Sequence, residues 1–398
     1  MSAVSSRWDK AGWFFLFTFA AASLFSISVA QIAAAGLGAV WAGRHAAARQ
    51  WPDFSPLAWP FAAFIIASLI AALFSLDVRE SVKDSKDLTH IVLYFAAYDL
   101  LTRGFAPAGA LLRTVAACGF AAAVVGFGQA ARKGIELHDR ISGAQGMYMT
   151  YAGLLMLAFV IALCAALFSR QRRDWWLWPA LAALAFAIML SLTRSALIGA
   201  LAGSLVAIGL WRPKALIAAP VLLAIALALA PAAARERAFS VFDLENRSNK
   251  ERLYVWGAGV KIAADHPLFG VGQNSFPLVY PQYRHPEVTE PDISHLHNNV
   301  LELAAERGLI GLAAWLSIWI AALVVMIRGW RALAPGPSNK RAALAAGFAG
   351  MAAFHSAGMF EYNFGDSEIQ MLMYLLMALA AAAPAARANG GSSALSAG

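Results

Sequence analysis

Long apolar runs recur along nearly the whole chain of 398 residues, and few folds accommodate them. A helix needs about 20 apolar residues to cross a bilayer, where only helices and closed barrels satisfy their backbone groups. About twelve runs are candidates by this criterion: 11–27, 29–43, 57–75, 90–102, 107–128, 147–169, 175–191, 195–211, 214–231, 308–328, 341–359 and 367–385. The sequence therefore predicts an all-α polytopic membrane protein with about twelve transmembrane helices. Residues 11–43 alternatively form one long tilted helix, bent at Ser26-Ile27-Ser28.

The composition excludes an ordinary soluble domain. Hydrophobic residues make up 60% of the chain and charged residues 14%, whereas about a quarter of a soluble domain is charged. No small-residue cleavage site follows the first apolar run, so we expect a retained span rather than a removed signal peptide. Cys118 and Cys164 fall inside predicted spans and offer neither a disulfide framework nor a cysteine-based metal site.

Basic residues favour one side of the predicted bundle. With the N-terminus in the cytoplasm, the inner side receives about half of the 31 Lys and Arg residues but few of the 23 acids, namely Asp9, Asp53, Asp99 and Asp174. Every short inner loop is then basic, which is the positive-inside pattern. Both termini are therefore predicted to be cytoplasmic. The net charge of +8 follows from this topology and requires no nucleic-acid partner.

One polar excursion, residues 232–307, interrupts the apolar pattern, and the topology places it in the periplasm. It is rich in Arg, His and Asn, and the other connections are short, so a membrane enzyme would keep its active site here. The chain then divides into transmembrane helices 1–9 (residues 1–231), this loop, transmembrane helices 10–12 (308–385) and a disordered cytoplasmic tail (386–398).

The pattern inside the large loop is mainly helical. Residues 249–263 predict an amphipathic helix that ends before Pro267, because proline cannot continue a helix. Its apolar stripe at helical spacing is Leu253, Trp256 and Val260. We expect a flexible turn at residues 269–272, followed by irregular backbone at a series of prolines.

The end of the loop carries the residues best suited to proton transfer. Asn298 or Asn299 is predicted to cap a helix that continues into the tenth span. His297 stands at its start, where the helix dipole disfavours an imidazolium and leaves the neutral form that a general base needs. His295 is the competing candidate, and a purely structural capping role for His297 remains an alternative. Two carboxylates on this helix either orient His297, pair with Arg252 or face water: Glu302 and Glu306.

Arginines gather on the predicted outer face. Arg194 stands in a short turn between the seventh and eighth spans, without a nearby acid. Such a residue is costly at the membrane edge unless it snorkels or binds an anion, and phosphate fits a guanidinium bidentately. Arg252 lies on the loop helix. Together with Arg252, five other bases form a basic mouth that fits either an anion site or a solvated surface: Arg140, Arg235, Arg237, Arg247 and Lys250.

Several common catalytic motifs are absent from the sequence. The chain contains no Asp-X-Asp, no P-loop and no local Ser/His/Asp arrangement. The sequence therefore predicts neither a metal site nor a cofactor, and arginines are the groups available to neutralise a departing diphosphate.

Two patterns in the large loop resemble a known family. His297-Asn298, nine residues and then Gly308-X-X-Gly311 resemble the loop signature of the O-antigen ligases. Arg252-X-X-X-Trp256 followed by residues 265–272 resembles the wider superfamily, which includes O-antigen polymerases and bacterial protein O-oligosaccharyltransferases.

The resemblance implies a glycosyltransferase of the C-type structural class in the bacterial inner membrane. Such an enzyme moves a glycan from undecaprenyl diphosphate to a sugar of the lipid A–core, on the periplasmic side, without a metal and with inversion. Its partners would be these two glycolipids and the membrane lipids. By resemblance His297 is the catalytic histidine, Arg252 the loop arginine and Arg194 the arginine at the outer end of a span. We also expect substrate contacts from Arg140, Arg247, Asn298 and Glu302.

Three other functions remain open. An O-antigen polymerase shares the donor but uses a second lipid-linked glycan as acceptor. A protein O-oligosaccharyltransferase uses Ser or Thr, usually in a longer chain with a soluble C-terminal region. A transporter of lipid-linked anions would carry functional charges within its spans, which here are nearly free of charge.

Overall fold

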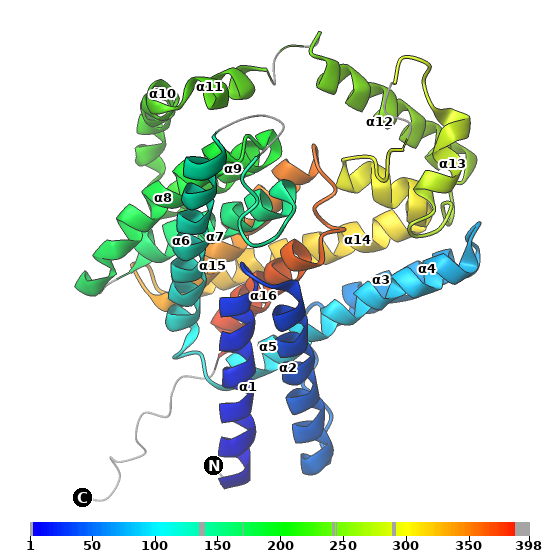
Figure 1. Ribbon diagram of the computed structural model, residues 1–398. Coiled ribbons are helices and arrows are strands. Elements are labelled where there is room, and N and C mark those ends of the chain that lie inside the picture. The colour runs from blue at the N-terminus through cyan, green and yellow to red at the C-terminus, as the bar shows by residue number, and fades with distance from the viewer. Residues whose placement is uncertain are drawn as a thin grey trace, which may run out of the picture.

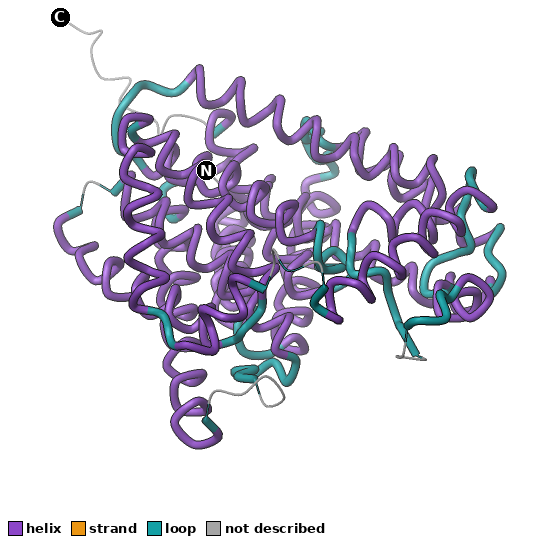
Figure 2. Tube along the Cα trace, turned by 90° about the horizontal axis from the view of Figure 1, so that it is seen from above, coloured by secondary structure: helices purple, strands orange, loops and turns teal. Residues whose placement is uncertain are grey.

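The computed structural model describes residues 3–134, 140–169, 171–240, 243, 245–288 and 292–386, and these residues are folded into helices without a strand (Figures 1 and 2). Apart from Ala386, the predicted tail (386–398) lies outside the described residues. The first half of the chain forms α1 (Ala3–Ala22), α2 (Ile27–Ala48), α3 (Ala58–Leu73), α4 (Val78–Asp84), α5 (Ile91–Arg103), α6 (Ala108–Lys133), α7 (Tyr148–Phe168), α8 (Leu177–Leu190) and α9 (Arg194–Trp211).

The second half begins with shorter helices and ends with three long ones. These are α10 (Ala219–Leu229), α11 (Ala232–Phe239), α12 (Arg247–Asp265), α13 (Phe276–Tyr283), α14 (Asn299–Ala332), α15 (Asn339–Gly358) and α16 (Ser367–Ala385). Three short 3₁₀-helices precede α5, α8 and α10: Ser85–His90, Arg172–Trp176 and Pro213–Ala218. Figure 1 shows α10, α11 and α12 as an arch over one end of the bundle.

A helix occupies each of the twelve predicted apolar segments, so the all-α prediction is confirmed. The single long helix considered for residues 11–43 is wrong. The chain turns after α1, Ser26 caps α2 by accepting a hydrogen bond from Val29 N, and the two helices pack as a hairpin (Figure 1). Within the described residues five helices are long and apolar enough to cross a membrane, α6, α7, α9, α14 and α16. The full count of twelve spans stays a prediction.

The distribution of buried side chains fits an apolar surrounding. In the most apolar windows of α7 and α16, 83% of residues are buried, so these two helices form the centre of the bundle. The corresponding window of α14 is only 33% buried, and its exposed side chains include Leu316 and Ile320. A peripheral helix in water would present polar residues outward. An outer surface this apolar indicates contact with a membrane.

Close packing of α9 on α15 determines where the N-terminus of α9 lies. At Gly199, an added Cβ would come within 2.7 Å of Ala353 O, and at Gly203 within 2.9 Å of Ala349 O. The two glycines are four residues apart, so they face the same way and bring the two backbones together. Arg194 begins α9, and its position therefore depends on this contact.

Helix α12 confirms the predicted helix in the large loop, but the predicted apolar stripe is wrong. Leu253 and Val260 are 51% and 56% exposed. The buried face consists of Val255, Ala258, Gly259 and Ile262. Apolar residues occupy two sides of this helix, and periodicity alone does not tell which side faces the core. Arg252 precedes Val255 by one turn and so lies on the inward side.

The residues after α12 also differ from prediction, because α13 is a helix where prolines suggested irregular backbone. Pro277 stands in its first turn, where a missing N–H costs little, and the helix is only two turns long. Residues 269–272 are not a free turn either. Val271 N and Gly272 N donate to Ala305 O and Glu306 O, both at 2.9 Å.

This docked segment explains the kink in α14. Gly308 has φ 65° inside the helix, and a Cβ there would lie 2.2 Å from Leu268 O. Leu309 N donates to Pro267 O at 2.8 Å, replacing helix bonds lost at the kink. The kink separates a buried first part of α14, which ends at Arg307, from the apolar remainder of the helix. It thereby orients the helix start that carries His297.

Candidate active site

His297 is placed by the cap of α14. Asn298 is the N-cap: its side-chain oxygen accepts from Val300 N and Leu301 N at 2.9 and 3.1 Å. His297 itself has φ 51°, a left-handed conformation that costs energy for a residue other than glycine. This conformation turns its imidazole away from the helix axis and towards the loop between α15 and α16.

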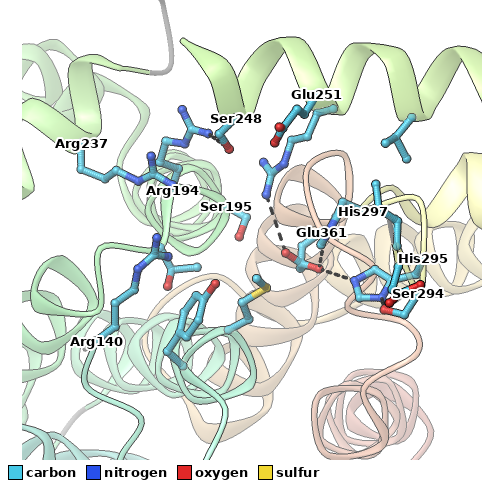
Figure 3. Close-up of a pocket in the computed structure, with 17 residues that line it drawn as sticks. Arg140, Arg194, Ser195, Arg237, Ser248, Glu251, Ser294, His295, His297 and Glu361 are labelled. Carbon is cyan, nitrogen blue, oxygen red and sulfur yellow. Dashed lines mark hydrogen bonds and ion pairs between the residues drawn. The ribbon is translucent and has the colours of Figure 1, made fainter. Parts of the chain in front are cut away.

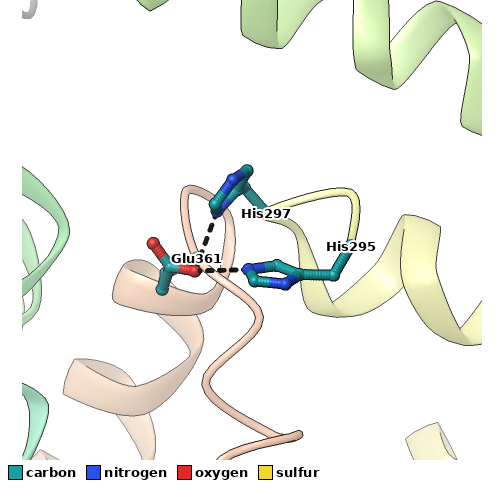
Figure 4. A group of neighbouring side chains, drawn as sticks. All are labelled: His295, His297 and Glu361. Atoms are coloured by element: carbon teal, nitrogen blue, oxygen red, sulfur yellow. Dashed lines mark hydrogen bonds and ion pairs between the residues drawn. The ribbon is translucent and has the colours of Figure 1, made fainter. Parts of the chain in front are cut away.

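The carboxylate of Glu361, in that loop, holds two imidazoles. Its Oε1 lies 2.9 Å from His297 Nδ1 and 3.1 Å from His295 Nε2. Figure 4 shows both rings directed at this carboxylate. Tyr362 N donates to the same oxygen at 3.1 Å. Burial alone would raise the pKa of Glu361, but the hydrogen bonds from His295 and His297 bring that pKa well below its ordinary value. Glu361 is therefore an anion at neutral pH.

This contact fixes the tautomer of His297. An ionised carboxylate has only acceptor lone pairs, so His297 Nδ1 must carry the hydrogen. A neutral imidazole then leaves Nε2 unprotonated and able to take a proton. The arrangement matches a general base oriented by a carboxylate. The second imidazole, His295, contacts the same carboxylate oxygen.

Hydrogen bonds to the backbone of Leu296 hold the segment that carries the two histidines. Leu296 is fully buried between them, its backbone N–H donates to the carboxylate of Glu302, and its carbonyl accepts from Trp256 Nε1 at 3.0 Å. Asn298 Nδ2 donates to Met359 O at 3.1 Å, which ties the start of α14 to the loop of Glu361. These hydrogen bonds therefore position the imidazoles of His295 and His297 before any ligand binds.

Arginines form the opposite side of the same cavity. Figure 3 shows Arg140, Arg194 and Arg237 across from Glu361, His295 and His297. Arg194 is only 6% exposed, and its described partners are neutral oxygens: Ser240 O at 3.2 Å, Ser240 Oγ at 3.3 Å and Ser248 Oγ at 3.2 Å. The guanidinium carbon of Arg140 lies 4.4 Å from the centre of the Tyr148 ring. Arg194 therefore does not simply extend into solvent.

The arginines destabilise one another's charge. Burial, with repulsion from Arg140 and Arg252, lowers the pKa of Arg237. Burial also lowers the pKa of Arg252, against the attraction of Glu361 Oε2, which lies 3.9 Å from Arg252 Nη2. Guanidinium groups remain protonated at neutral pH despite such shifts. A bound anion would relieve this repulsion, so the site is suited to a phosphate-containing ligand.

Two adjoining cavities meet at Arg194 and Arg252. The larger, about 490 Å³, is lined by the arginines, both histidines and Glu361. The smaller, about 120 Å³, has a largely apolar wall that includes Ile198, Leu253 and Trp256. A charged group at the two arginines would therefore have a polar space on one side and an apolar space on the other.

The predicted site residues are partly brought together. Arg140, Arg194, Arg252 and His297 line the larger cavity. Asn298 and Glu302 are buried beneath it, where they cap α14 and hold Leu296. Glu306 is also buried, beside Arg307, so the suggestion that these carboxylates face water is wrong. The other bases of the predicted mouth lie outside the described lining: Arg235 and Arg247, which are exposed, and Lys250, which is half-buried.

Glu361 was missed by sequence reasoning. It lies in a connection of only eight residues, 359–366, between two apolar helices. The available signal was the density of polar groups in that short segment, Glu361, Asn363 and Asp366, on the same predicted side as the large loop.

Residues 179–316 match the family model described as O-antigen ligase. The matched segment contains Arg194, Arg252, His295 and His297, whereas Arg140 and Glu361 lie outside it. No curated protein sequence matches the chain. Over this segment, about a third of its length, the chain is similar to the O-antigen ligase family.

Proposed function

We propose that this protein is an O-antigen ligase that transfers a glycan from undecaprenyl diphosphate to a sugar of the lipid A–core, on the periplasmic face of the bacterial inner membrane. One observation carries the proposal: a single cavity places a carboxylate-held histidine opposite a cluster of arginines. Sugar transfer from a diphosphate needs a base at the acceptor and positive charge at the leaving group.

His297 is the proposed base. The acceptor hydroxyl attacks the anomeric carbon of the donor from the face opposite the diphosphate, and its proton passes to His297 Nε2. The bond from the anomeric carbon to the diphosphate oxygen breaks with its electron pair, so the anomeric configuration inverts. Glu361 keeps Nδ1 protonated and stabilises the imidazolium that forms.

Arg194 and Arg252 are the proposed contacts of the diphosphate, with Arg140 and Arg237 on the same wall. They stand where negative charge grows as the bond breaks, which is the electrostatic contribution that usually dominates in such sites. The reaction then needs no metal for charge neutralisation. The apolar cavity beyond Arg194 and Arg252 would hold the first isoprene units of the donor lipid.

The proposed topology has both termini in the cytoplasm, residues 232–307 in the periplasm, and transmembrane helices within 1–231 and 308–385. Ion pairs between distant segments are consistent with it. Arg44–Asp99, Arg103–Asp9 and Arg113–Asp174 join residues predicted for the inner side, and Arg252–Glu361 joins residues predicted for the outer side.

The test is a transfer assay with purified protein, undecaprenyl-diphosphate-linked glycan and lipid A–core, in EDTA. Wild type should give a slower-migrating lipopolysaccharide product, and His297→Ala and Arg252→Ala should lose it. The Arg235→Ala variant is a matched control, because Arg235 is exposed and outside the cavity lining.

Two results would overturn the proposal. Full transfer by His297→Ala would remove the base assignment. A ladder of lipid-linked glycan formed from the donor alone, with no product on the core, would make the protein a polymerase.

A further inference from the structure

Three possible metal ligands lie close together in the cavity: His295, His297 and Glu361. The two imidazole nitrogens and a carboxylate oxygen all lie within 4.8 Å of one another. Ligands bound to one metal at about 2.1 Å with bond angles of 90–109° are separated by about 3.0 to 3.4 Å. The distances from Glu361 Oε1 to the two nitrogens, 2.9 and 3.1 Å, are close to that separation, so small adjustments would admit an ion.

The backbone holds this donor set in advance. His295 and His297 are two residues apart, and the buried Leu296 points between them into the core, where its side chain packs against Gly259. The left-handed turn at His297 directs the second ring to the same oxygen as the first. A general base needs one imidazole on Glu361. A second imidazole on the same oxygen is not required for that role, and it completes a chelate.

We propose that His295, His297 and Glu361 form an inhibitory site for a divalent transition metal, of which Zn²⁺ is the representative. Imidazole nitrogens with one carboxylate suit Zn²⁺, Cu²⁺ or Ni²⁺ and not Mg²⁺, which requires oxygen ligands. Arg252 lies 3.9 Å from the other oxygen of Glu361, so the positive charge weakens but does not block binding. In the proposed topology the site faces the periplasm, which external metal ions reach before the cytoplasm.

The inhibition follows from the chemistry of one ring and rests on the proposed function. A neutral imidazole has one hydrogen and two nitrogens. When Zn²⁺ takes Nδ1 of His297, the hydrogen moves to Nε2. That nitrogen then donates instead of accepting, so it no longer takes the proton of the acceptor hydroxyl. Metal binding therefore switches off the base without displacing the arginines.

Binding is tested without reference to activity. Tag-free protein in metal-free detergent buffer is titrated with Zn²⁺ by calorimetry, as wild type, His295→Gln and His297→Gln. We expect one Zn²⁺ per wild-type chain and affinity at least tenfold weaker in both variants. Gln preserves a hydrogen bond to Glu361 but is a poor metal ligand. His285→Ala is the matched control, because His285 stacks on Tyr254 outside the cavity lining, and it should bind Zn²⁺ like wild type.

No Zn²⁺ binding by wild type, or equal binding by wild type and His295→Gln, would overturn the site. The inhibition is measured as the ratio of transfer with and without Zn²⁺ for each protein separately. Wild-type transfer should fall at least tenfold with saturating Zn²⁺, recover with EDTA and be unaffected by Mg²⁺. Unchanged transfer by Zn²⁺-loaded wild type would overturn the inhibition. If no sample transfers glycan even in EDTA, the proposed function fails, and the calorimetry still decides the metal site.

Discussion

His297 Nδ1 lies 2.9 Å from Glu361 Oε1, although 63 residues separate them in the sequence. The contact joins the start of α14 to the loop between α15 and α16, and two further bonds support it. Asn298 Nδ2 donates to Met359 O at 3.1 Å, and Asn299 Nδ2 donates to Asn363 Oδ1 at 2.6 Å. The orientation of the proposed base therefore depends on the last two long helices as well as on the large loop.

The Glu361→Gln variant tests this relationship directly. The neutral amide no longer requires Nδ1 of His297 to carry the hydrogen, and it stabilises the imidazolium less. We expect the turnover rate to fall on the order of 10²-fold, since general base catalysis contributes about 10² to 10⁴. Glu361→Asp, which keeps the charge on a shorter side chain, should retain more activity than Glu361→Gln. Equal activity of Glu361→Gln and wild type would show that His297 does not depend on this carboxylate.

Arg194→Lys separates charge from geometry at the proposed diphosphate site. Lys keeps the positive charge but loses the planar fork that bonds two phosphate oxygens. One lost bond to a charged group is worth about 1.5 to 3 kcal/mol, so KM for the lipid-linked donor should rise tenfold or more. Arg235→Lys, at an exposed position outside the cavity, is the control and should leave KM unchanged. A normal KM for Arg194→Lys would remove Arg194 from the donor site.

The sequence allowed the helical class and the cap at Asn298 to be predicted, because long apolar runs and capping residues act locally. It did not reveal Glu361. The partnership of Glu361 with His297 arises from the packing of α14 against α15 and α16, and no short pattern encodes it. Likewise, the stripe of α12 was assigned wrongly because Leu253 and Val260 repeat at the same spacing as the buried residues.

The sequence also did not reveal which of the basic residues face the cavity. Charge counting identified six bases as a mouth, but of these only Arg140, Arg237 and Arg252 line the cavity, together with Arg194. Arg247 lies on the same helix as Arg252 yet pairs with Glu251 at 3.0 Å and is largely exposed. The direction of each side chain depends on how the helix is rotated against its neighbours, and charge composition does not report that rotation.

Gly308→Ala should destabilise the fold strongly. Its φ of 65° is strained for Ala, and the new Cβ would lie 2.2 Å from Leu268 O, a backbone atom that cannot move alone. We expect a loss on the order of 2 to 4 kcal/mol in the free energy of unfolding. Gly257→Ala is the matched control in α12, where no atom lies within 4 Å of the added Cβ. It should be neutral or stabilising by about 0.5 to 1 kcal/mol, as measured by denaturation in detergent.

Gly199→Ala tests whether helix packing positions Arg194. The added Cβ would approach Ala353 O to 2.7 Å, so α9 must move away from α15. Transfer activity should fall in parallel with the rise in KM for the donor, because Arg194 moves with the helix. Gly209→Ala lies on the same helix, and its nearest contact is an ordinary 3.5 Å to Leu216 Cδ1. An unchanged KM in Gly199→Ala would show that the packing of α9 is not what positions Arg194.

Asp366 predicts how stability depends on pH. Burial, with repulsion from Glu361 and Glu368, raises the pKa of Asp366 to about 7 from an ordinary value of 3.8. Between these two values the folded state binds more protons than the unfolded state, so Asp366 makes the free energy of unfolding decrease as pH rises. Glu361 acts in the opposite direction, since its pKa is lowered from 4.5, but its contribution changes only as pH falls below about that value.

Asp366→Asn isolates this effect. The amide cannot ionise but can still bond Thr150 Oγ1, which lies 3.2 Å from Asp366 Oδ2. Between pH 5 and pH 8, the free energy of unfolding of wild type should fall by more than about 1 kcal/mol relative to that of Asp366→Asn. The reason is that the pKa of Asp366 is raised by more than one unit, and one unit corresponds to about 1.4 kcal/mol. Thr150→Val provides the control, because it removes the hydroxyl and leaves the carboxyl to titrate, so its pH dependence should remain. Parallel stability curves for wild type and Asp366→Asn across this range would show that Asp366 ionises normally in the folded protein.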